Sequence, residues 1–222
     1  MPAQCQPADD TRSLLLEAAA DTFAEFGYHR SSTREICRRA GANVAAIHYH
    51  FGDKAELYRA VFREPFFLNE SFHDLFAAPS LTLPRCERLQ VFYRFWLLPL
   101  AGDPRIQRLL RLRAREDAEP SGVLGDTWIK HVLPRHQRLT GFLCQELGLA
   151  AVDDEVERLA FALVGMGISV YHMREIIGVC APSLIADAER LAEMAQHLAA
   201  YADTLVEAEL TRRRALAGEH QS

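Results

Sequence analysis

The stretch from Ser31 to Leu57 constrains the fold more than any other part of the chain. Ser32 and Asp53 each precede a glutamate by three residues, the form of a capping box. Between them, Gly41 suits a left-handed helix C-cap and Asn43 suits the N-cap of a following helix. This spacing predicts two short helices joined by a tight turn, followed by the start of a third helix.

Two short helices around a glycine-containing turn form a helix-turn-helix, whose second helix is free to enter a DNA groove. Here the predicted second helix ends near Phe51 and buries Ile47. Its first residues are small, which lets the backbone approach a nucleic acid closely, and its last residues are polar aromatics. An amphipathic helix that faces solvent and binds nothing is the alternative interpretation.

The same residues resemble the DNA-binding domain of the TetR/AcrR family of bacterial repressors. The shared motifs are Phe23…Gly27-Tyr28, Ser31-Ser32, Glu35-Ile36, Ala40-Gly41-Ala42, Asn43 to Ile47, Tyr49-His50-Phe51, Lys54 and Leu57. The chain departs from the family pattern at Cys37, Ala42 and His48, where alanine, valine and tyrosine are usual. The segment NVAAI-x-YHFG further resembles the branch that senses hydrophobic or xenobiotic compounds.

The resemblance implies which residues contact DNA. Phosphates are expected at Ser32, Arg34 and Lys54, and the groove wall at the Ala45 backbone. Bases or their methyl groups should face the second helix. The full predicted set is Ser32, Arg34, Asn43, Val44, Ala45, Ala46, His48, Tyr49, His50 and Lys54.

The whole chain is predicted to be all-α, because no period-two alternation lasts and no Asn-Gly or Asp-Gly hairpin appears. Residues 1–10 are expected to form a disordered tail. Further helices are expected over 11–26, 54–62, 85–101, 104–117, from residue 122 to 147 with a kink near Pro134, 153–180 and 184–216, with helical spacing also over 66–78 and a loop over 79–84. The domains are therefore a three-helix DNA-binding head at 11–58 and an effector-binding and dimerisation body at 59–217.

Charge is distributed in favour of the head. The net charge of −5 argues against a basic coat over the whole chain. From Tyr28 to Arg59, however, six basic residues stand against three acidic ones, a local balance of +3 that dimerisation would double. A run of arginines from Arg105 to Arg115 is spread around its helix, which favours solvated faces and ion pairs over a second nucleic-acid site.

Other classes of function lack their signatures. No run of eighteen apolar residues occurs, so we expect no membrane partner. The N-terminus lacks the form of a signal peptide, and the five cysteines form no C-x-x-C. We therefore expect a cytoplasmic protein. Nucleophile-elbow, Walker and H-E-x-x-H motifs are missing, and neither His48 with His50 nor His131 with His136 shares a helix face. We therefore predict no enzyme activity, no metal and no cofactor.

The body carries more aromatic residues than two dimer-forming helices require. An apolar pocket for a small, mostly hydrophobic effector is one use for them, and an ordinary core is the other. The predicted effector-binding residues are Phe92, Trp96, Trp128, Phe142, Met166 and His172. The family resemblance also implies a homodimer built by the last two helices, with Gly165 and Leu198 at its interface.

The sequence thus predicts a repressor whose homodimer binds a double-stranded, pseudo-palindromic DNA operator and is released by the effector. Two alternatives stay open. One is a helical small-molecule carrier or enzyme with an incidental head. The other is a DNA-binding dimer that responds to no effector.

Overall fold

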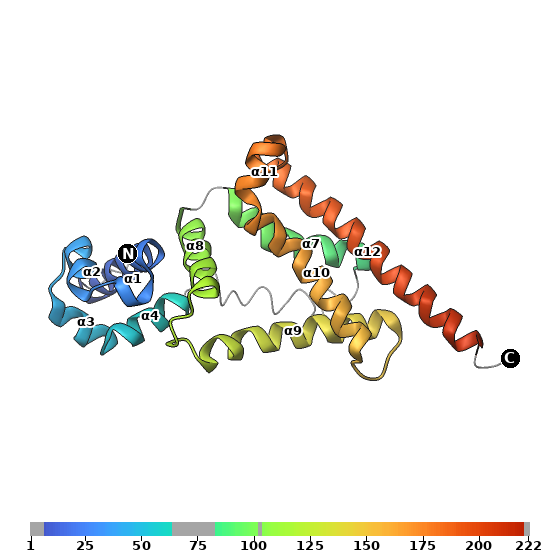
Figure 1. Ribbon diagram of the computed structural model, residues 1–222, viewed down its shortest axis with the longest axis horizontal. Helices are drawn as coiled ribbons and strands as arrows, with labels where there is room; N and C mark the ends of the chain where they lie inside the picture. Colours follow the sequence, from blue (N-terminus) through green and yellow to red (C-terminus); the bar gives the residue numbers. More distant parts are fainter. Residues whose placement is uncertain (1–6, 64–82, 102–103, 220–222) are drawn as a thin grey trace, which may run out of the picture. The chain divides into compact units, whose positions relative to one another are not determined.

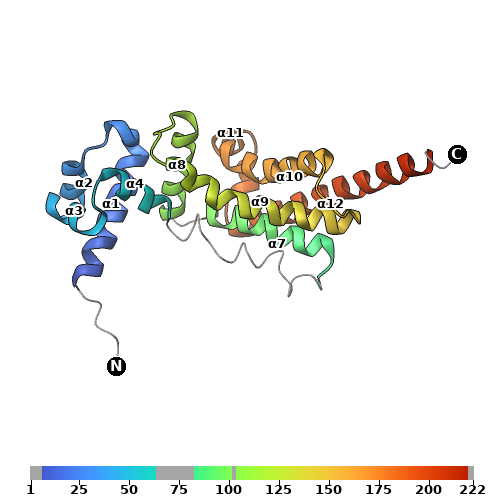
Figure 2. The ribbon, with the colours of Figure 1, turned by 90° about the horizontal axis from the view of Figure 1, so that it is seen from below.

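The computed structural model describes residues 7–63, 83–101 and 104–219, except the side chains of 7–9, 106, 126–128, 131 and 219. The predicted helical segment over 66–78 and most of the predicted loop over 79–84 lie outside these residues. All regular structure that is described is helical, so the all-α prediction is confirmed (Figures 1 and 2). The helices are α1 (Pro7–Arg30), α2 (Thr33–Ala40), α3 (Val44–Phe51), α4 (Lys54–Phe62), α7 (Arg85–Leu97), α8 (Pro104–Ala118), α9 (Asp126–Leu147), α10 (Asp154–His172), α11 (Arg174–Cys180) and α12 (Ala188–Glu219), with 3₁₀ turns η2 (Leu98–Ala101) and η3 (Pro182–Ile185).

The helices pack as two compact units. The first contains Met1–Leu68 together with Pro104–His131, and the second contains Asn69–Asp103 together with Val132–Ser222. Helix α8 therefore packs with the four N-terminal helices, although it follows residue 58 in the chain. The first turns of α9 belong to the first unit and the rest of α9 to the second.

In the first unit, α2, α3, α4 and α8 all pack against α1. The apolar stripe of α1 supplies Leu15, Ala19 and Phe23, none of which is exposed to solvent. The other helices add buried side chains to the same core: Ile36, Ile47, Leu57, Val61, Leu109 and Leu112. A cluster of aromatic rings around Tyr58 joins them, with Phe23 edge-on at a centroid distance of 4.7 Å.

Helix α1 starts one turn earlier than predicted. The sequence assigned residues 7–10 to a disordered tail, but α1 begins at Pro7, where the fixed φ of proline suits the first helical position. The break at Gly27 is confirmed, since this residue has φ 74° and ψ 171°. A side chain at Gly27 would be strained by this φ and would also meet Arg115, whose Nε lies 2.8 Å from an ideal Cβ.

Ion pairs link α8 to α1. Arg108 Nε lies 3.0 Å from Asp21 Oδ1, and Arg105 pairs with Glu17. Arg115 Nη1 donates to the Glu25 carbonyl oxygen at 2.9 Å. The arginine run thus forms ion pairs, as expected, but several of its partners lie on a helix more than eighty residues away in sequence.

A buried polar network joins α4 to the turn after α8. The Tyr58 hydroxyl donates to Glu116 Oε2 at 2.6 Å, and the Ser121 amide and hydroxyl donate to Glu116 Oε1 at 3.1 and 2.8 Å. Arg59 Nε donates to the Val123 carbonyl oxygen at 3.0 Å. Desolvation and the Glu116 charge raise the pKa of Tyr58, so the phenol stays protonated and acts as the donor.

In the second unit, α12 packs most extensively against α7. Small buried residues of α12, Ala195, Ala199 and Ala202, allow the two backbones to come close. Phe92, Tyr93 and other buried side chains complete this core, which also contains Leu89, Leu97, Leu139, Leu143, Val156, Ala160, Leu163, Leu191 and Val206. Leu198 belongs to it as well, because only 8% of its surface is exposed.

The predicted single helix over 153–180 is wrong. It is interrupted at Met173, whose φ −93° and ψ 9° end α10 and start α11 with a bend of 67°. The last helix begins at Ala188 and not at residue 184, because Pro182 first forms a 3₁₀ turn and Asp187 Oδ1 accepts from the Arg190 amide at 2.9 Å. No single described helix is both long and apolar enough to cross a membrane, although α10 and α11 taken as one bent pair reach that length and composition.

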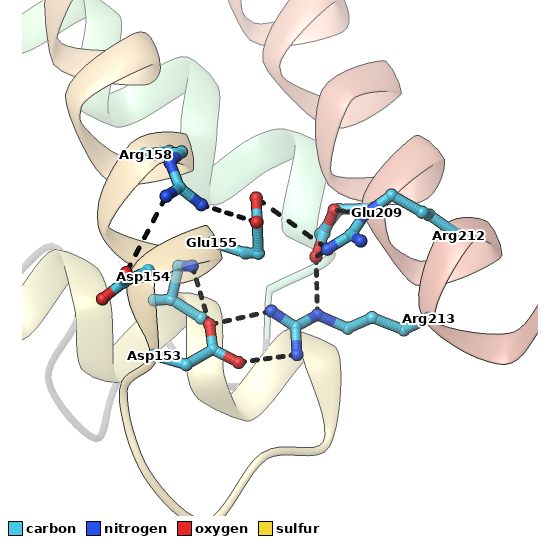
Figure 3. A network of polar contacts seen from close by, with 8 residues as sticks. Asp153, Asp154, Glu155, Arg158, Glu209, Arg212 and Arg213 are labelled. Carbon is cyan, nitrogen blue, oxygen red and sulfur yellow. Dashed lines mark hydrogen bonds and ion pairs between the residues drawn. The ribbon is translucent and has the colours of Figure 1, made fainter. Parts of the chain in front are cut away.

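Charged side chains fasten the start of α10 to the end of α12 (Figure 3). Asp153 is the N-cap of α10 and accepts from the Val156 amide at 3.0 Å. Its carboxylate also receives two hydrogen bonds from Arg213, both at 2.8 Å. Glu209 binds Arg213 and Arg212 on α12, so the two helix ends share one network of alternating charge.

Candidate functional site

The caps that shape the helix-turn-helix form as predicted. Ser32 Oγ accepts from the Glu35 amide at 3.1 Å, and Asn43 Oδ1 accepts from the Ala46 amide at 3.1 Å. Asp53 Oδ1 accepts from the Glu56 amide at 2.8 Å. Gly41 ends α2 in the left-handed region, with φ 65° and ψ 25°.

The reciprocal half of the first capping box is replaced by ion pairs. Glu35 was expected to reach back to the Ser32 amide, but its carboxylate accepts from Arg38 Nε and Nη2 at 2.8 and 2.7 Å, and from Arg39 Nε at 2.7 Å. These arginines lower the pKa of Glu35 to about 2. Two of the cations counted toward the head's positive balance are therefore engaged in ion pairs, Arg38 with Glu35 and Arg39 with both Glu35 and Glu25.

A hydrogen bond from Cys37 stabilises the turn between α2 and α3. Its thiol is buried and lies 3.3 Å from the Asn43 carbonyl oxygen, to which it donates. Burial raises the pKa of this thiol, so it remains a neutral donor. The cysteine that departs from the family pattern thus supports the residue that caps α3.

Helix α3 presents an exposed face. Ile47 is its one fully buried anchor, with 1% of its surface exposed. Tyr49 is 81% exposed and Val44 37% exposed. Among the other predicted base-facing residues, Ala46 and His50 are half-buried. Ala46 and Phe51 also pack, partly buried, against the core of the head. A helix anchored on one side, with Val44 and Tyr49 exposed on the other, has the form of a recognition helix.

Further predicted contacts lie at the ends of these helices. Ser32, Asn43 and Ala45 are exposed, and the Ser32 hydroxyl hydrogen remains available to a phosphate. His48 is also exposed, and its Nδ1 donates to the Gly52 carbonyl oxygen at 2.7 Å, which directs Nε2 away from the backbone. Arg34 is exposed and has no ion-pair partner among the residues that the structure describes.

Lys54 is more constrained than the sequence suggests. Its Nζ lies 4.4 Å from the centroid of the Tyr28 ring, and its side chain is half-buried. Burial lowers the pKa of this ammonium group. The lysine therefore also contributes to the packing of the head.

The predicted effector residues are only partly brought together. Phe92 is fully buried, with the Trp96 ring edge-on at 6.4 Å, and Phe142 lies 3% exposed on α9. Met166 is half-buried on α10, whereas His172 is exposed at the end of that helix. The side chain of Trp128 lies outside the described residues.

Arg88 was missed by sequence reasoning and lies among these aromatics. Only 4% of its surface is exposed, and its guanidinium carbon lies 4.3 Å from the centroid of the Phe142 ring. Its Nη1 binds Glu146 at 3.0 Å. Arg88 precedes Phe92 by four residues, the helical spacing that places two side chains on one face. This spacing puts Arg88 beside a predicted effector residue but gives no sign that the arginine is buried.

A cavity of about 180 Å³ opens between α1 and α8, lined by Arg12, Ser13, Leu16, Glu17, Ala20, Arg105, Arg108 and Leu109. Its cations are engaged by the α1 carboxylates or, for Arg12, by the Phe51 ring at 5.3 Å. No group of three His, Cys, Asp or Glu side chains in the described ranges is arranged to hold a metal.

Comparisons with known proteins agree with this geometry. Residues 15–61 match the bacterial regulatory proteins of the tetR family, and residues 86–208 match the C-terminal domain of the HTH-type transcriptional dual regulator CecR. CecR of Shigella flexneri is 28% identical over 172 residues, which cover 74% of this chain and 77% of CecR. The transcriptional activator FasR of Mycolicibacterium smegmatis is 44% identical over 55 residues, a quarter of each chain.

Solved structures share the fold. The SmeT–triclosan complex aligns with a TM-score of 0.62 and 23% identity over 86% of this chain and 90% of SmeT. A TetR transcription regulator from Haloarcula marismortui aligns with a TM-score of 0.59 and 20% identity over 88% of this chain and 98% of its own. Since the CecR-type domain covers more than half of the chain and adjoins a tetR-type head, the chain belongs to the TetR family of bacterial transcriptional regulators.

Proposed function

We propose that the chain is a repressor that binds a pseudo-palindromic operator as a homodimer, with α3 of each head in a major groove. The exposed face of α3 carries this proposal. Val44 and Tyr49, which are exposed, and the half-buried Ala46 and His50 would read bases, and Asn43 and Ala45 would bring the helix N-terminus close to the DNA. Ser32, Arg34, His48 and Lys54 contact the flanking phosphates.

Selection of bound genomic fragments by the purified protein tests this proposal. The selected fragments should share an inverted repeat, and footprinting should protect two half-sites about 34–36 Å apart. Binding should weaken steeply with salt because phosphate contacts release counterions. A carrier or enzyme with an incidental head would enrich no sequence, and that result contradicts the proposal.

The direction of regulation needs a separate experiment. Relatives include a dual regulator, an activator and the repressor AcnR of Corynebacterium glutamicum. Placing the selected operator between a promoter and a reporter gene should give lower expression when the protein is present. Higher expression would leave the proposal of DNA binding intact and would identify the protein as an activator at that promoter.

We assign effector sensing and dimerisation to the parts of the predicted body that lie in the second unit, residues 69–103 and 132–217. A mostly hydrophobic effector, aromatic or with an acyl chain, would bind the second unit around Phe92, Trp96, Phe142, Met166 and His172; Trp128, the sixth residue predicted from the sequence, belongs to the first unit. To release DNA, it must prefer the non-binding state. A preference of about a hundredfold, roughly 2.7 kcal/mol, suffices if the free states are near balance.

Intrinsic fluorescence offers a direct test, because Trp96 and Trp128 are the two tryptophans of the chain. An inducing compound should quench this fluorescence and lower operator affinity over the same concentration range. Reciprocity requires the operator to weaken compound binding by the same factor. If a screen finds tight binders and none changes operator affinity, the effector-independent DNA-binding dimer is the correct interpretation.

A further inference from the structure

One face of α7 carries buried polar donors without an acceptor in the described part of the chain. Arg88, Phe92 and Trp96 are spaced four residues apart and therefore share this face. Arg88 Nε and Nη2 and Trp96 Nε1 are buried and find no hydrogen-bond acceptor among the residues that the structure describes. Buried donors are nearly always paired in native proteins, so these orphaned groups require an explanation.

The unsatisfied edge of Arg88 is the edge with which arginine clamps a carboxylate. In this protein, Arg38 uses Nε and Nη2 to hold both oxygens of Glu35, and Arg212 uses the same two atoms on Glu209. Arg88 instead binds Glu146 through Nη1, which leaves the Nε–Nη2 edge free. The Phe142 ring, 4.3 Å from the guanidinium carbon, stabilises the positive charge of Arg88. It does not serve as a hydrogen-bond acceptor for Nε or Nη2.

Of the described carboxylates near Arg88 and Arg85, only Glu146 pairs with Arg88. Its neighbour Arg85 is occupied by Asp203 at 2.6 Å and by Glu207 at 3.1 Å. Glu146 lies between the two arginines, 3.0 Å from Arg88 and 3.8 Å from Arg85. Glu146 is thus shared, and the buried Arg88 charge is opposed by one carboxylate at one of its three nitrogens.

The side chains around this face of α7 are apolar. Phe92 and Phe142 are almost completely buried. Across from Trp96, α10 carries Gly167, whose ideal Cβ would lie 3.5 Å from the indole Cγ. Two turns of α7, about 12 Å, separate Arg88 from Trp96 along the helix. A ligand matching this face is elongated and apolar, with an anionic group at one end.

We propose that the body binds an apolar anion, an aromatic or acyl carboxylate or sulfonate, whose two oxygens pair with Arg88 Nε and Nη2. Trp96 Nε1 donates to an acceptor farther along the ligand. This inference rests on the proposed effector site in the body and specifies the chemical class of its ligand. Arg88 then selects anions, while Phe92 and Phe142 supply apolar contact.

Two fluorescent probes that differ only in a sulfonate test this selection. 8-Anilinonaphthalene-1-sulfonate carries the group, and N-phenyl-1-naphthylamine has the same rings without it. The wild-type protein should bind the sulfonate about tenfold more tightly, the effect of a hydrogen-bonded charge pair. Arg88→Met should abolish this preference while leaving the affinity for the neutral probe within about twofold.

Controls separate recognition from damage to the fold. Arg88→Met leaves Glu146 with only its longer contact to Arg85, so the double variant Arg88→Met/Glu146→Gln removes both charges of the pair and should lose the preference equally. Arg94→Met, an exposed arginine on the same helix, should keep it. The inference is overturned if the wild type binds neither probe saturably, or if either Arg88 variant with a cooperative thermal transition retains the preference.

The operator assay distinguishes this inference from the proposed function. If sulfonate binding depends on Arg88 but leaves affinity for the selected operator unchanged, the anion site stands and the release mechanism fails. If the sulfonate releases operator equally from the wild type and from Arg88→Met, release stands and the Arg88 site is wrong.

Discussion

Arg34 and Arg38 lie one turn apart on α2, yet their guanidinium groups have different capacities. Arg38 commits Nε and Nη2 to Glu35, whereas Arg34 is exposed without an ion-pair partner in the described part of the chain. Only Arg34 is available to a phosphate without breaking an existing ion pair. The local positive balance read from the sequence therefore overstates the number of cations free for DNA.

Replacing Arg34 with alanine should weaken binding to operator and random DNA by similar factors, because phosphates carry no direct sequence information. The slope of log affinity against log salt should fall by about one for each head. Electrophoretic mobility shifts over a salt series measure both effects. Arg94→Ala, on α7, serves as the control, and an unchanged slope in Arg34→Ala would remove this residue from the interface.

Tyr58→Phe should destabilise the protein by about 1–3 kcal/mol, because it removes the buried hydrogen bond to the Glu116 carboxylate. Urea unfolding followed by circular dichroism measures this as a lower midpoint at unchanged slope. Tyr49→Phe is a matched control, since Tyr49 is 81% exposed. Equal midpoints for the two variants would show that the Tyr58–Glu116 bond contributes nothing to stability.

Residue-scale prediction succeeded where the interaction is local in sequence. Ser32, Asn43 and Asp53 each cap a helix through an amide three residues later, so composition and spacing were sufficient. Arg88 could not be found in this way, because its importance depends on α9 side chains more than fifty residues away. An arginine in an amphipathic helix is ordinarily solvated, and only tertiary packing shows that this one is buried.

At the scale of elements, Asp153 performs two tasks at the start of α10. It caps the helix and pairs with Arg213 on α12, and these contacts lower the pKa of its carboxyl from 3.8 to about 2. Because the folded-state pKa is below the unfolded value, the stabilisation is complete above about pH 5 and disappears as pH falls through this range.

The variant Asp153→Asn retains a good N-cap but loses the charge, so it isolates the ion pair. Near neutral pH, the free energy of unfolding of the wild type should exceed that of the variant by less than about 1 kcal/mol, since the Asp153 side chain is 47% exposed. Thermal unfolding from pH 7 to pH 2 should show this difference closing between about pH 4 and pH 2. Asp154→Asn, with a side chain 92% exposed, should show little difference at any pH. A gap that persists at pH 2 would contradict the assignment.

Element boundaries were predictable only where the chain carries a local stop signal. Gly27, Gly41 and Gly52 mark real breaks, each with positive φ. Met173 interrupts α10 without a glycine or proline beside it, so periodicity alone ran on to Cys180. The packing of α8 on α1 was likewise invisible, because a helix stripe shows that a face is buried but not against which partner.

At the scale of the whole molecule, the proposed homodimer requires apolar surface that one protomer leaves exposed. On α10, Phe161 is 65% exposed, and an added Cβ at Gly165 would meet nothing within 4 Å. On α12, Tyr201 and Leu205 are 57% and 40% exposed. Leu198 is already buried within the protomer, so we place the proposed interface on these other residues.

Gly165→Leu should split the dimer, because a bulky side chain prevents close approach of a second helix at this position. Light scattering at micromolar concentration should report the mass of one chain, and operator binding should fall with it. Gly141→Leu on α9, also exposed and free of neighbours, controls for the change in helix propensity. A wild-type protein that is itself monomeric would exclude the dimer, and an intact dimer in Gly165→Leu would place the interface elsewhere.

The packing of α8 against α1 limits where this chain can be joined to a related regulator to make a hybrid protein. The acidic positions on α1, Glu17 and Asp21, meet basic positions on α8, Arg105 and Arg108. A hybrid regulator that joins this head to a foreign body at residue 63 would lose those partners and uncover the apolar surface beneath Leu112. Transplants that carry residues 104–125 along with the head should remain folded. The two halves of each pair are therefore expected to change together as such regulators diverge.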